Sequence, residues 1–351
     1  RHADVMAAFR DSERFSNAHG VSIDPAASGP DAHRTMSFLA MDPPQHGRMR
    51  GLVSRGFTPR RVAGMEDGIR ALTREHLDRC LGRETFDFVA DVAGRVPMDV
   101  ISEMVGVPVA DRAELRRLSD LLVHRDEGVT DVPPAGVEAA MELVVYYADL
   151  IARRRADPAD DLVSALCAAE VDGDRLTDDE ITGFLFLMVV AGNETTTKLL
   201  THAWYWAARF PETWSAVADA PSLVPACVEE TLRYDTSSQM LARITTTEVE
   251  LHGTTIPAGD RVLLLVGAAN RDPRAFADPD RFDLERDTSG TASFGVGRHY
   301  CMGASLARLE ARVVLEEMVR QIKHYEIDEA GARRTHSVKV RGFATLPTTV
   351  V

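Results

Sequence analysis

The 351-residue sequence contains no hydrophobic run long enough to cross a membrane as a helix. Its longest uninterrupted apolar run, Phe184 to Ala191, has eight residues, whereas a helix that spans a bilayer needs about 20. No signal peptide is recognisable either. We therefore expect no membrane span in this chain; the cytoplasmic location that we expect is inferred from the scarce cysteines described below.

Basic residues are outnumbered by acidic ones. Lysine and arginine together number 40 and aspartate and glutamate 54, which gives a net charge of −14. Because nucleic-acid binding requires a basic surface, this balance argues against a nucleic-acid partner. A hydrophobic fraction of 45% with 27% charged residues is typical of a folded globular protein and excludes disordered and fibrous classes.

Cysteine is scarce and scattered. The four cysteines include no C-x-x-C pair, which excludes a disulfide scaffold and a zinc site of the usual spacing. We expect Cys80, Cys167 and Cys227 to be buried apolar residues of helices in a reducing compartment. Cys301 has a different sequence context.

Most of the chain has helical periodicity, with only short strand-like segments. A capping-box pattern (T-D-D-E) that starts at Thr177 predicts a long apolar helix ending near Arg209. Alternating β-branched residues predict strands at 243–251 and 261–266. No linker divides the sequence. We therefore expect one domain over residues 1–351 that is mainly α with small β-sheets.

The segment F-G-V-G-R-H-Y-C-M-G places Cys301 between a loop with two glycines and an amphipathic helix. Gly295 and Gly297 permit a tight turn, and the helix N-terminus adds free N–H groups and the positive end of a dipole. Both favour a thiolate, which an axial iron ligand requires. Spacing alone leaves three other interpretations open: a structural cysteine, a phosphate loop without its third glycine, and a zinc site of Cys301 and His299 without further ligands.

The pattern F-G-x-G-x-H-x-C-x-G, followed by x-x-L-A-R-x-E, resembles the haem-binding signature of the cytochrome P450 family in its soluble bacterial form. The resemblance covers nearly the whole chain and implies a single-domain cytochrome P450-like fold. We expect the family's first strands and helix to be absent from this N-terminally trimmed sequence. The resemblance implies that Cys301 supplies the proximal thiolate of haem b and that His299 approaches a propionate. The other haem contacts that it implies in this loop are Phe294, Gly295, Arg298 and Gly303.

The long apolar helix carries a second motif at Ala191, Gly192, Glu194 and Thr195. Gly192 weakens the helix, Thr195 can donate to a backbone carbonyl, and an acid beside a hydroxyl can relay protons. Taken alone, the segment is better explained by close packing and a solvated glutamate. The resemblance matches it to the family's oxygen-activating motif A/G-G-x-D/E-T. This implies O2 as a co-substrate, Glu194 and Thr195 as catalytic residues, and Ala191 and Gly192 as cofactor contacts.

Three further basic residues are expected near the haem propionates. His46 and Arg50, four residues apart, share one helix face, and imidazole and guanidinium groups bind carboxylates well. Without context they are two solvated polar residues. The string D-P-P-Q-H-G-R-M-R resembles the family's haem-facing helix, which implies propionate contacts from His46 and Arg50 and, in a strand segment, from Arg243.

Glu230 and Arg233 stand three apart in a helical segment, where such a pair is common and weak if exposed. By resemblance they form the family's structural E-x-x-R pair. The resemblance adds a third basic residue before the cysteine loop, and Arg281 in D-P-D-R-F fits that place. If this cluster is buried, loss of one partner costs roughly 3–5 kcal/mol.

These implications define a haem-dependent monooxygenase that inserts one oxygen atom from O2 into a C–H bond of a small apolar substrate, such as a lipid, steroid or terpenoid. Because this sequence has no flavin or nicotinamide domain, we expect electrons to come from separate proteins, by resemblance a ferredoxin and ferredoxin reductase. A basic patch for the ferredoxin is one interpretation, and scattered solvated arginines are another. The patch would contain Arg55, Arg60, Arg61, Arg298, Arg308 and Arg312.

Two alternatives come from other classes of protein. One is a haem-thiolate sensor or carrier without turnover, which the pairing of Glu194 with Thr195 disfavours. The other is a helical protein without haem, in which Cys301 is structural. A peroxide-driven hydroxylase is a closer variant. The apolar side chains expected near the substrate are Phe184, Leu187, Met188, Met240 and Leu241.

Overall fold

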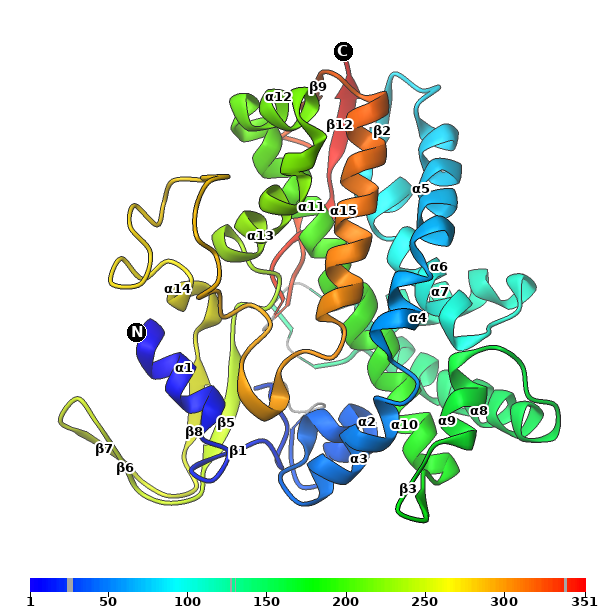
Figure 1. Cartoon of the computed structure of the whole chain (residues 1–351), viewed down its shortest axis with the longest axis vertical. Coiled ribbons are helices and arrows are strands. Elements are labelled where there is room, and N and C mark those ends of the chain that lie inside the picture. The colour runs from blue at the N-terminus through cyan, green and yellow to red at the C-terminus, as the bar shows by residue number, and fades with distance from the viewer. Residues whose placement is uncertain (24–27, 127, 130, 338–339) are drawn as a thin grey trace.

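The computed structural model describes residues 1–23, 28–126, 128–129, 131–337 and 340–351. Helices form most of the molecule, and small antiparallel sheets flank them (Figure 1). This confirms the predicted mainly helical class with small sheets. Within these residues, no helix combines the length and apolar character needed to cross a membrane.

The N-terminal half of the chain is built from helices of varied length. Its longest, α8, packs against α7 and α10. The helices are α1 (His2–Arg10), α2 (His33–Met36), α3 (Gln45–Val53), α4 (Pro59–Ala63), α5 (Glu66–Cys80), α6 (Val96–Val105), α7 (Val109–Val123), α8 (Pro134–Ala156) and α9 (Leu162–Ala168).

The C-terminal half holds the helices that carry the predicted site. A continuous rod runs from α10 (Asp178–Met188) through a π-helical turn (Val189–Asn193) into α11 (Glu194–Arg209). Its predicted capping box is confirmed, because the Glu180 N–H donates to Thr177 Oγ1 (3.2 Å) and the Thr177 N–H donates to Glu180 Oε2 (2.9 Å). The remaining helices are α12 (Pro211–Asp219), α13 (Val224–Tyr234), α14 (Val266–Ala269) and α15 (Ala304–Gln321).

The strands form five small antiparallel sheets among the described residues. Three strands pair in the order β1-β5-β8 and three in the order β2-β12-β9, while β3-β4, β6-β7 and β10-β11 are two-stranded. The strands are β1 (Phe15–Ser16), β2 (Thr85–Asp87), β3 (Glu170–Val171), β4 (Asp174–Arg175), β5 (Leu241–Thr245), β6 (Val249–Leu251), β7 (Thr254–Ile256), β8 (Arg261–Leu264), β9 (Tyr325–Ile327), β10 (Arg333–Arg334), β11 (Phe343–Thr345) and β12 (Pro347–Val350).

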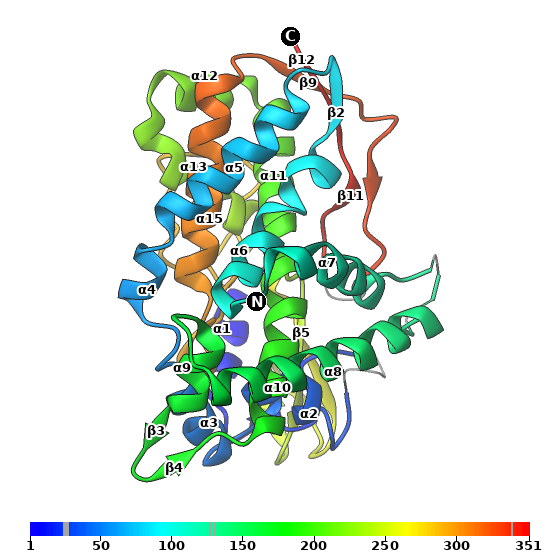
Figure 2. The same ribbon diagram turned by 90° about the vertical axis from the view of Figure 1, so that its right-hand side faces the viewer.

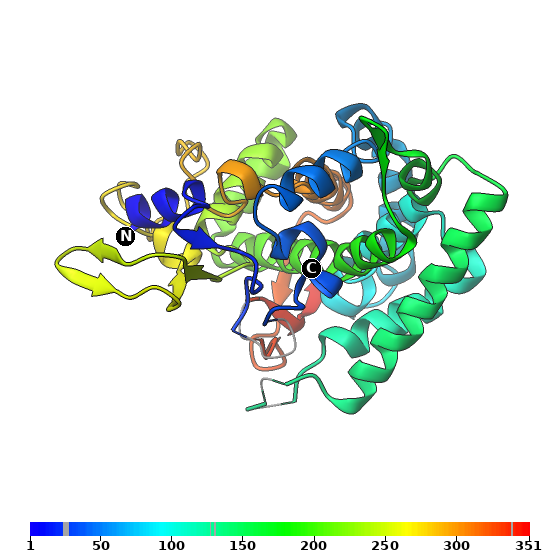
Figure 3. The same ribbon diagram turned by 90° about the horizontal axis from the view of Figure 1, so that it is seen from below.

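The single strand predicted at 243–251 is wrong. The chain bends at 246–248, so the segment divides into β5 and β6, which belong to different sheets. β6 pairs instead with β7 across His252 and Gly253, whose φ angles of 52° and 77° suit a tight hairpin turn. The hairpin projects from the body on the side opposite α7 and α8 (Figure 3).

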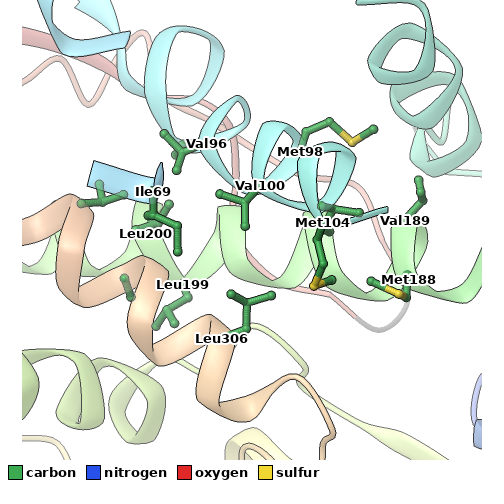
Figure 4. Close-up of a cluster of buried hydrophobic side chains, with 14 of the residues drawn as sticks. Ile69, Val96, Met98, Val100, Met104, Met188, Val189, Leu199, Leu200 and Leu306 are labelled. Carbon is green, nitrogen blue, oxygen red and sulfur yellow. The ribbon is translucent and has the colours of Figure 1, made fainter. Parts of the chain in front are cut away.

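The main hydrophobic core lies where α5, α6, α11 and α15 meet (Figure 4). Because α11 packs directly on α15, this core fixes the motif at residues 191–195 of the long helix, called the distal motif below, relative to the cysteine loop that precedes α15. Figure 4 labels core side chains from these helices and from the adjoining α10 and π-helical turn, namely Ile69, Val96, Met98, Val100, Met104, Met188, Val189, Leu199, Leu200 and Leu306.

Candidate functional site

Cys301 lies in a tight loop that turns back on itself just before α15. The Cys301 N–H donates to the carbonyl of Phe294 (2.9 Å), which closes the loop. Gly295 and Gly297 have φ angles of 65° and 76°, a region that favours glycine. A Cβ atom at position 297 would also lie 3.3 Å from the carbonyl oxygen of Phe9 in α1. The predicted role of the two glycines in the turn is confirmed.

The Cys301 thiol faces both N–H groups and positive charges. The backbone N–H groups of Gly303 and Ala304 act on the sulfur, and the charges of Arg50 and Arg308 also favour the thiolate. The side chain is accessible to solvent, yet protein atoms surround it closely, and this desolvation outweighs the other effects and raises the thiol pKa. A metal coordinated by the sulfur would offset this effect, because a coordinated metal deprotonates a thiol.

Imidazole and guanidinium groups from three separate segments converge beside this loop. His46 and Arg50 come from α3, Arg243 from β5, and His299 from the cysteine loop itself. The rings of His46 and His299 have centroids only 4.1 Å apart. Burial lowers the pKa of His299 to about 3, and the positive charges of His46, Arg243, Arg50 and Arg298 contribute to that shift.

These converging groups have no acidic partner within ion-pair distance among the described residues. His46 Nε2, Arg50 Nη1 and both ring nitrogens of His299 are buried without a hydrogen-bond partner. Arg243 is 3% exposed, and its guanidinium donates to the carbonyl of Ala242 (2.7 Å). Burial lowers the pKa of Arg243 to about 10. Such unpaired buried groups are costly, so the site suits a ligand with two carboxylates beside a metal that binds thiolate. A haem is such a ligand, and the residues present fit it.

The remaining residues predicted to contact the cofactor in this loop differ in their placement. The Arg308 guanidinium lies over the ring of Phe294, 4.5 Å from its centroid, and Gly303 lies beside the Cys301 sulfur. Arg298 is exposed, although its charge acts on both His46 and His299. Contact of these three residues with a cofactor stays a prediction.

The distal motif lies at the junction of the π-helical turn and α11. Thr195 Oγ1 donates to the carbonyl of Ala191 (2.7 Å), which confirms the predicted bond to the backbone. The carbonyl of Thr195 in turn accepts a hydrogen bond from Ser237 Oγ (2.8 Å). A Cβ atom at Gly192 would lie 2.7 Å from Ile101 Cδ1, so a side chain here would have to displace the tip of the Ile101 side chain in α6. The oxygen-activating roles stay predictions.

Glu230 and Arg233 form a fully buried bidentate ion pair. Both Arg233 Nε and Nη2 donate to the Glu230 carboxylate at 2.8 Å, and both side chains are 0% exposed. Arg233 Nη1 also donates to the carbonyls of Asn270 and Pro279, each at 2.9 Å. The pair therefore ties α13 to the irregular segment before the cysteine loop, as a structural role requires.

The assignment of Arg281 as the third basic residue is wrong. The exposed Arg281 takes part only through its carbonyl, which accepts from Arg233 Nη2 (3.2 Å). The guanidinium that reaches the pair belongs to Arg286, whose Nε lies 3.2 Å from Glu230 Oε1 and whose side chain is 8% exposed. The turn that closes when the Arg281 N–H donates to the carbonyl of Asp278 (3.0 Å) leaves the Arg281 side chain outside. Both arginines follow D-P-D in the sequence, so spacing could not separate them.

Comparison with known proteins gives the family. A family model described as "Cytochrome P450" matches residues 137–348. The chain is 56% identical over its whole length to cytochrome P450 123 of Mycobacterium tuberculosis and covers 87% of that protein. It is 37% identical over 322 residues to the "Steroid C26-monooxygenase" of Mycobacterium tuberculosis, a match that covers 91% of this chain and 84% of the relative.

Solved structures agree with the sequence comparison. The Bacillus megaterium cytochrome CYP109E1 in complex with corticosterone is 30% identical, with a TM-score of 0.89 over 100% of this chain and 91% of that one. The chain that carries the converging thiol and cationic groups is thus similar throughout its length to proteins of one family.

Proposed function

Since this chain belongs to the cytochrome P450 family, it is a haem-iron monooxygenase that uses O2, and we propose that it oxygenates a C–H bond of a small apolar molecule of steroid, lipid or terpenoid type. The observation that carries the proposal is the convergence of the Cys301 sulfur with buried imidazole and guanidinium groups that, among the described residues, have no acidic partner within ion-pair distance. We propose that one domain, residues 1–351, contains all of these groups.

Each group of residues has a distinct role toward haem b in this proposal. Cys301 provides the sulfur ligand, and the N–H groups of the following turn stabilise its negative charge. His46, Arg50, Arg243 and His299 bind the two propionates. The proposed packing contacts with the haem come from Phe294, Gly295, Arg298 and Gly303 below, and from Ala191 and Gly192 on the distal helix. When bound, the haem iron supplies the redox chemistry of oxygen activation, which no side chain has.

Glu194 and Thr195 deliver protons in this proposal. The Thr195 hydroxyl proton is engaged by the Ala191 carbonyl, so its oxygen is free to accept a hydrogen bond from water and orient that water. Glu194 is the acid that passes a proton along such a water. The Glu230–Arg233 pair and Arg286 take no part in proton transfer and hold the segment beneath the site.

We expect Thr195→Ala to continue to consume electrons but to divert more of them from product to hydrogen peroxide. Without the hydroxyl, water near the oxygen site is no longer oriented, and the share of electrons lost as hydrogen peroxide should rise roughly tenfold, which corresponds to about 1.4 kcal/mol. Peroxide and product are measured per electron pair consumed. Thr197→Ala, on the same helix, is the control. Unchanged coupling in Thr195→Ala would remove Thr195 from the relay.

The proposed substrate class rests on the relatives and on a few apolar side chains. A relative is described as a steroid C26-monooxygenase, another as an erythromycin C-12 hydroxylase, and a similar structure contains corticosterone. In this chain Phe184, Leu187 and Met188 are buried within α10, while Met240 and Leu241 are half-buried. Steroids, fatty acids and terpenoids are titrated while the Soret band is followed, and products are identified by mass spectrometry. Binding without product would favour the sensor or carrier.

We propose a ferredoxin and its reductase as the electron donors. Of the predicted basic patch, Arg61, Arg308 and Arg312 are engaged by Asp160 (3.2 Å), Glu229 (2.5 Å) and Glu66 (2.6 Å). Arg55, Arg60 and Arg298 are exposed and, within the described chain, form no ion pair. This leaves a smaller positive surface for an acidic ferredoxin than the sequence predicted.

We therefore expect only a moderate salt effect on electron transfer. Raising the ionic strength should slow reduction by ferredoxin roughly two- to fivefold, because the remaining exposed charges are screened. Stopped-flow reduction rates measure the effect, with dithionite reduction as the control for the protein itself. A flat profile would remove the basic patch from the proposal.

A further inference from the structure

Lys198 is one of only three lysines in a sequence with 40 lysine and arginine residues, and it is buried. Its exposure is 4%, and it lies in α11 one helical turn after Glu194. Lysine is almost never fully buried unless it is paired, because an ammonium group is costly to remove from water. A charge is therefore retained at a position that an apolar side chain would fill at lower cost.

The Lys198 ammonium joins the distal acid to a strand from the far end of the chain. Its Nζ lies 3.1 Å from Glu194 Oε1, in a pair whose side chains are 5% and 15% exposed. The same Nζ donates to the carbonyl of Phe343 in β11 (2.8 Å). Figure 2 shows β11 running beside the helices, and β11 contacts α11 directly.

Gly342 makes room for the Lys198 side chain. A Cβ atom at position 342 would lie 2.4 Å from Lys198 Cδ, 2.5 Å from Cγ and 2.7 Å from Cβ. These distances are far below van der Waals contact, so any side chain at 342 would push Lys198 away from its present place. The absence of a side chain at 342 thus leaves the space that the Lys198 side chain occupies.

The same C-terminal segment is also linked by hydrogen bonds to Thr195, the hydroxyl residue beside Glu194. The Arg341 N–H donates to the carbonyl of Ser237 (2.8 Å), and Ser237 Oγ donates to the carbonyl of Thr195 (2.8 Å). Residues 341–343 therefore contact Glu194 through Lys198 and Thr195 through Ser237.

Lys198 also acts on a second carboxylate near Glu194. Asp120 of α7 is close enough for the Glu194 charge to raise its pKa, after the larger effect of desolvation. Lys198, Arg116 and Arg95 act in the opposite direction on Asp120. Lys198 thus pairs with Glu194 and also acts on Asp120, and its removal would leave less positive charge to offset the repulsion between the two carboxylates.

We infer that Lys198 is a positioning residue for Glu194, which holds the acid's carboxylate at the oxygen site and ties it to β11. Proton delivery then depends on the contact between α11 and residues 341–343. The inference rests on the proposed role of Glu194 and adds a residue that acts through it.

The test compares four variants of the haem-loaded enzyme, supplied with ferredoxin, reductase and substrate. Lys198→Met removes the charge and keeps the length of the side chain, whereas Lys198→Arg keeps the charge. Gly342→Ala displaces Lys198 without removing it, and the double variant Lys198→Ala with Gly342→Ala removes the contacts with Cγ and Cδ, but not the one with Cβ, without restoring the ammonium. Peroxide per electron pair, KM, kcat and melting temperature are measured for each. Hydrogen exchange of the amides at 342–345 reports the contact with β11 independently of turnover.

We expect Lys198→Met and Gly342→Ala each to raise the peroxide share roughly fivefold, or about 1 kcal/mol, with KM unchanged and faster exchange at 342–345. Lys198→Arg should recover most of the coupling. The double variant should regain part of the melting temperature lost in Gly342→Ala but not the coupling. Coupling that returns together with stability would show a merely structural lysine and overturn the inference. If Lys198→Met fails to retain haem, the inference is tested by comparing coupling and melting temperature between Gly342→Ala and the double variant.

Glu194→Gln separates this inference from the proposed function. If Glu194→Gln uncouples the enzyme and the Lys198 and Gly342 variants do not, the inference fails while the role of Glu194 stands. If Glu194→Gln leaves coupling unchanged, the proposed relay fails, and the inference fails with it.

Discussion

Replacing Cys301 by serine abolishes monooxygenase turnover, with an expected loss of at least about 100-fold, or roughly 3 kcal/mol of activation free energy. The hydroxyl of serine is a far weaker acid than a thiol, so the thiolate's electron donation that favours O–O cleavage is lost. The converging cationic groups remain in Cys301→Ser, and we expect part of the haem to be retained. The reduced carbon-monoxide difference spectrum should lose its long-wavelength Soret band.

The matched control for this change is Cys167→Ser. Cys167 is half-buried in α9, remote in sequence from the cysteine loop, and its substitution should leave the spectrum and turnover unchanged. Haem content is measured separately, so that loss of the cofactor is distinguished from loss of the ligand. A Cys301→Ser protein that keeps the long-wavelength band would show that another atom is the axial ligand.

Glu230→Gln is expected to cost about 3–5 kcal/mol of folding free energy, because it leaves the Arg233 guanidinium buried without a counter-charge. Domains of this kind are stable by only about 5–15 kcal/mol, so the variant should lose a large part of its stability and retain haem poorly. Urea unfolding followed by circular dichroism and by haem absorbance measures both effects.

Two neighbouring positions test the specificity of this effect. Glu229→Gln changes the preceding residue of the same helix, where the carboxylate is 29% exposed and pairs with Arg308; its cost should stay below about 1 kcal/mol. Arg281→Ala should also be mild, because Arg281 contributes only a backbone carbonyl. If Arg281→Ala destabilises the protein as much as Arg286→Ala, the assignment of Arg286 to the buried cluster is wrong.

The features that the sequence predicted correctly depend on local signals. The capping box at Thr177, the glycine turn around Cys301 and the bond from Thr195 to a preceding carbonyl each involve residues within a few positions of one another. Their geometry follows from backbone conformation and nearest neighbours, so spacing alone was sufficient to predict them.

The features that the sequence did not predict depend on the path of irregular chain over long distances. Arg281 and Arg286 lie in the same irregular segment, and the tertiary fold decides which guanidinium returns to Glu230. The break of the predicted strand at 246–248 follows from two different pairing partners, β8 and β7. The i,i+4 spacing of Glu194 and Lys198 was visible, but their burial against Phe343 depends on a strand more than a hundred residues away.

The π-helical turn at Val189–Asn193 has a geometric consequence for the motif that follows it. Each of its hydrogen-bonded rings contains one residue more than an α-helical ring, and one residue corresponds to a rotation of about 100° around a helix axis. Every side chain of α11 is therefore turned by about that angle relative to an unbroken continuation of α10. Removing a single residue from 189–193 would turn this segment into regular α-helix. Glu194 and Thr195 would then point in a different direction around the helix axis, although only one residue had been removed.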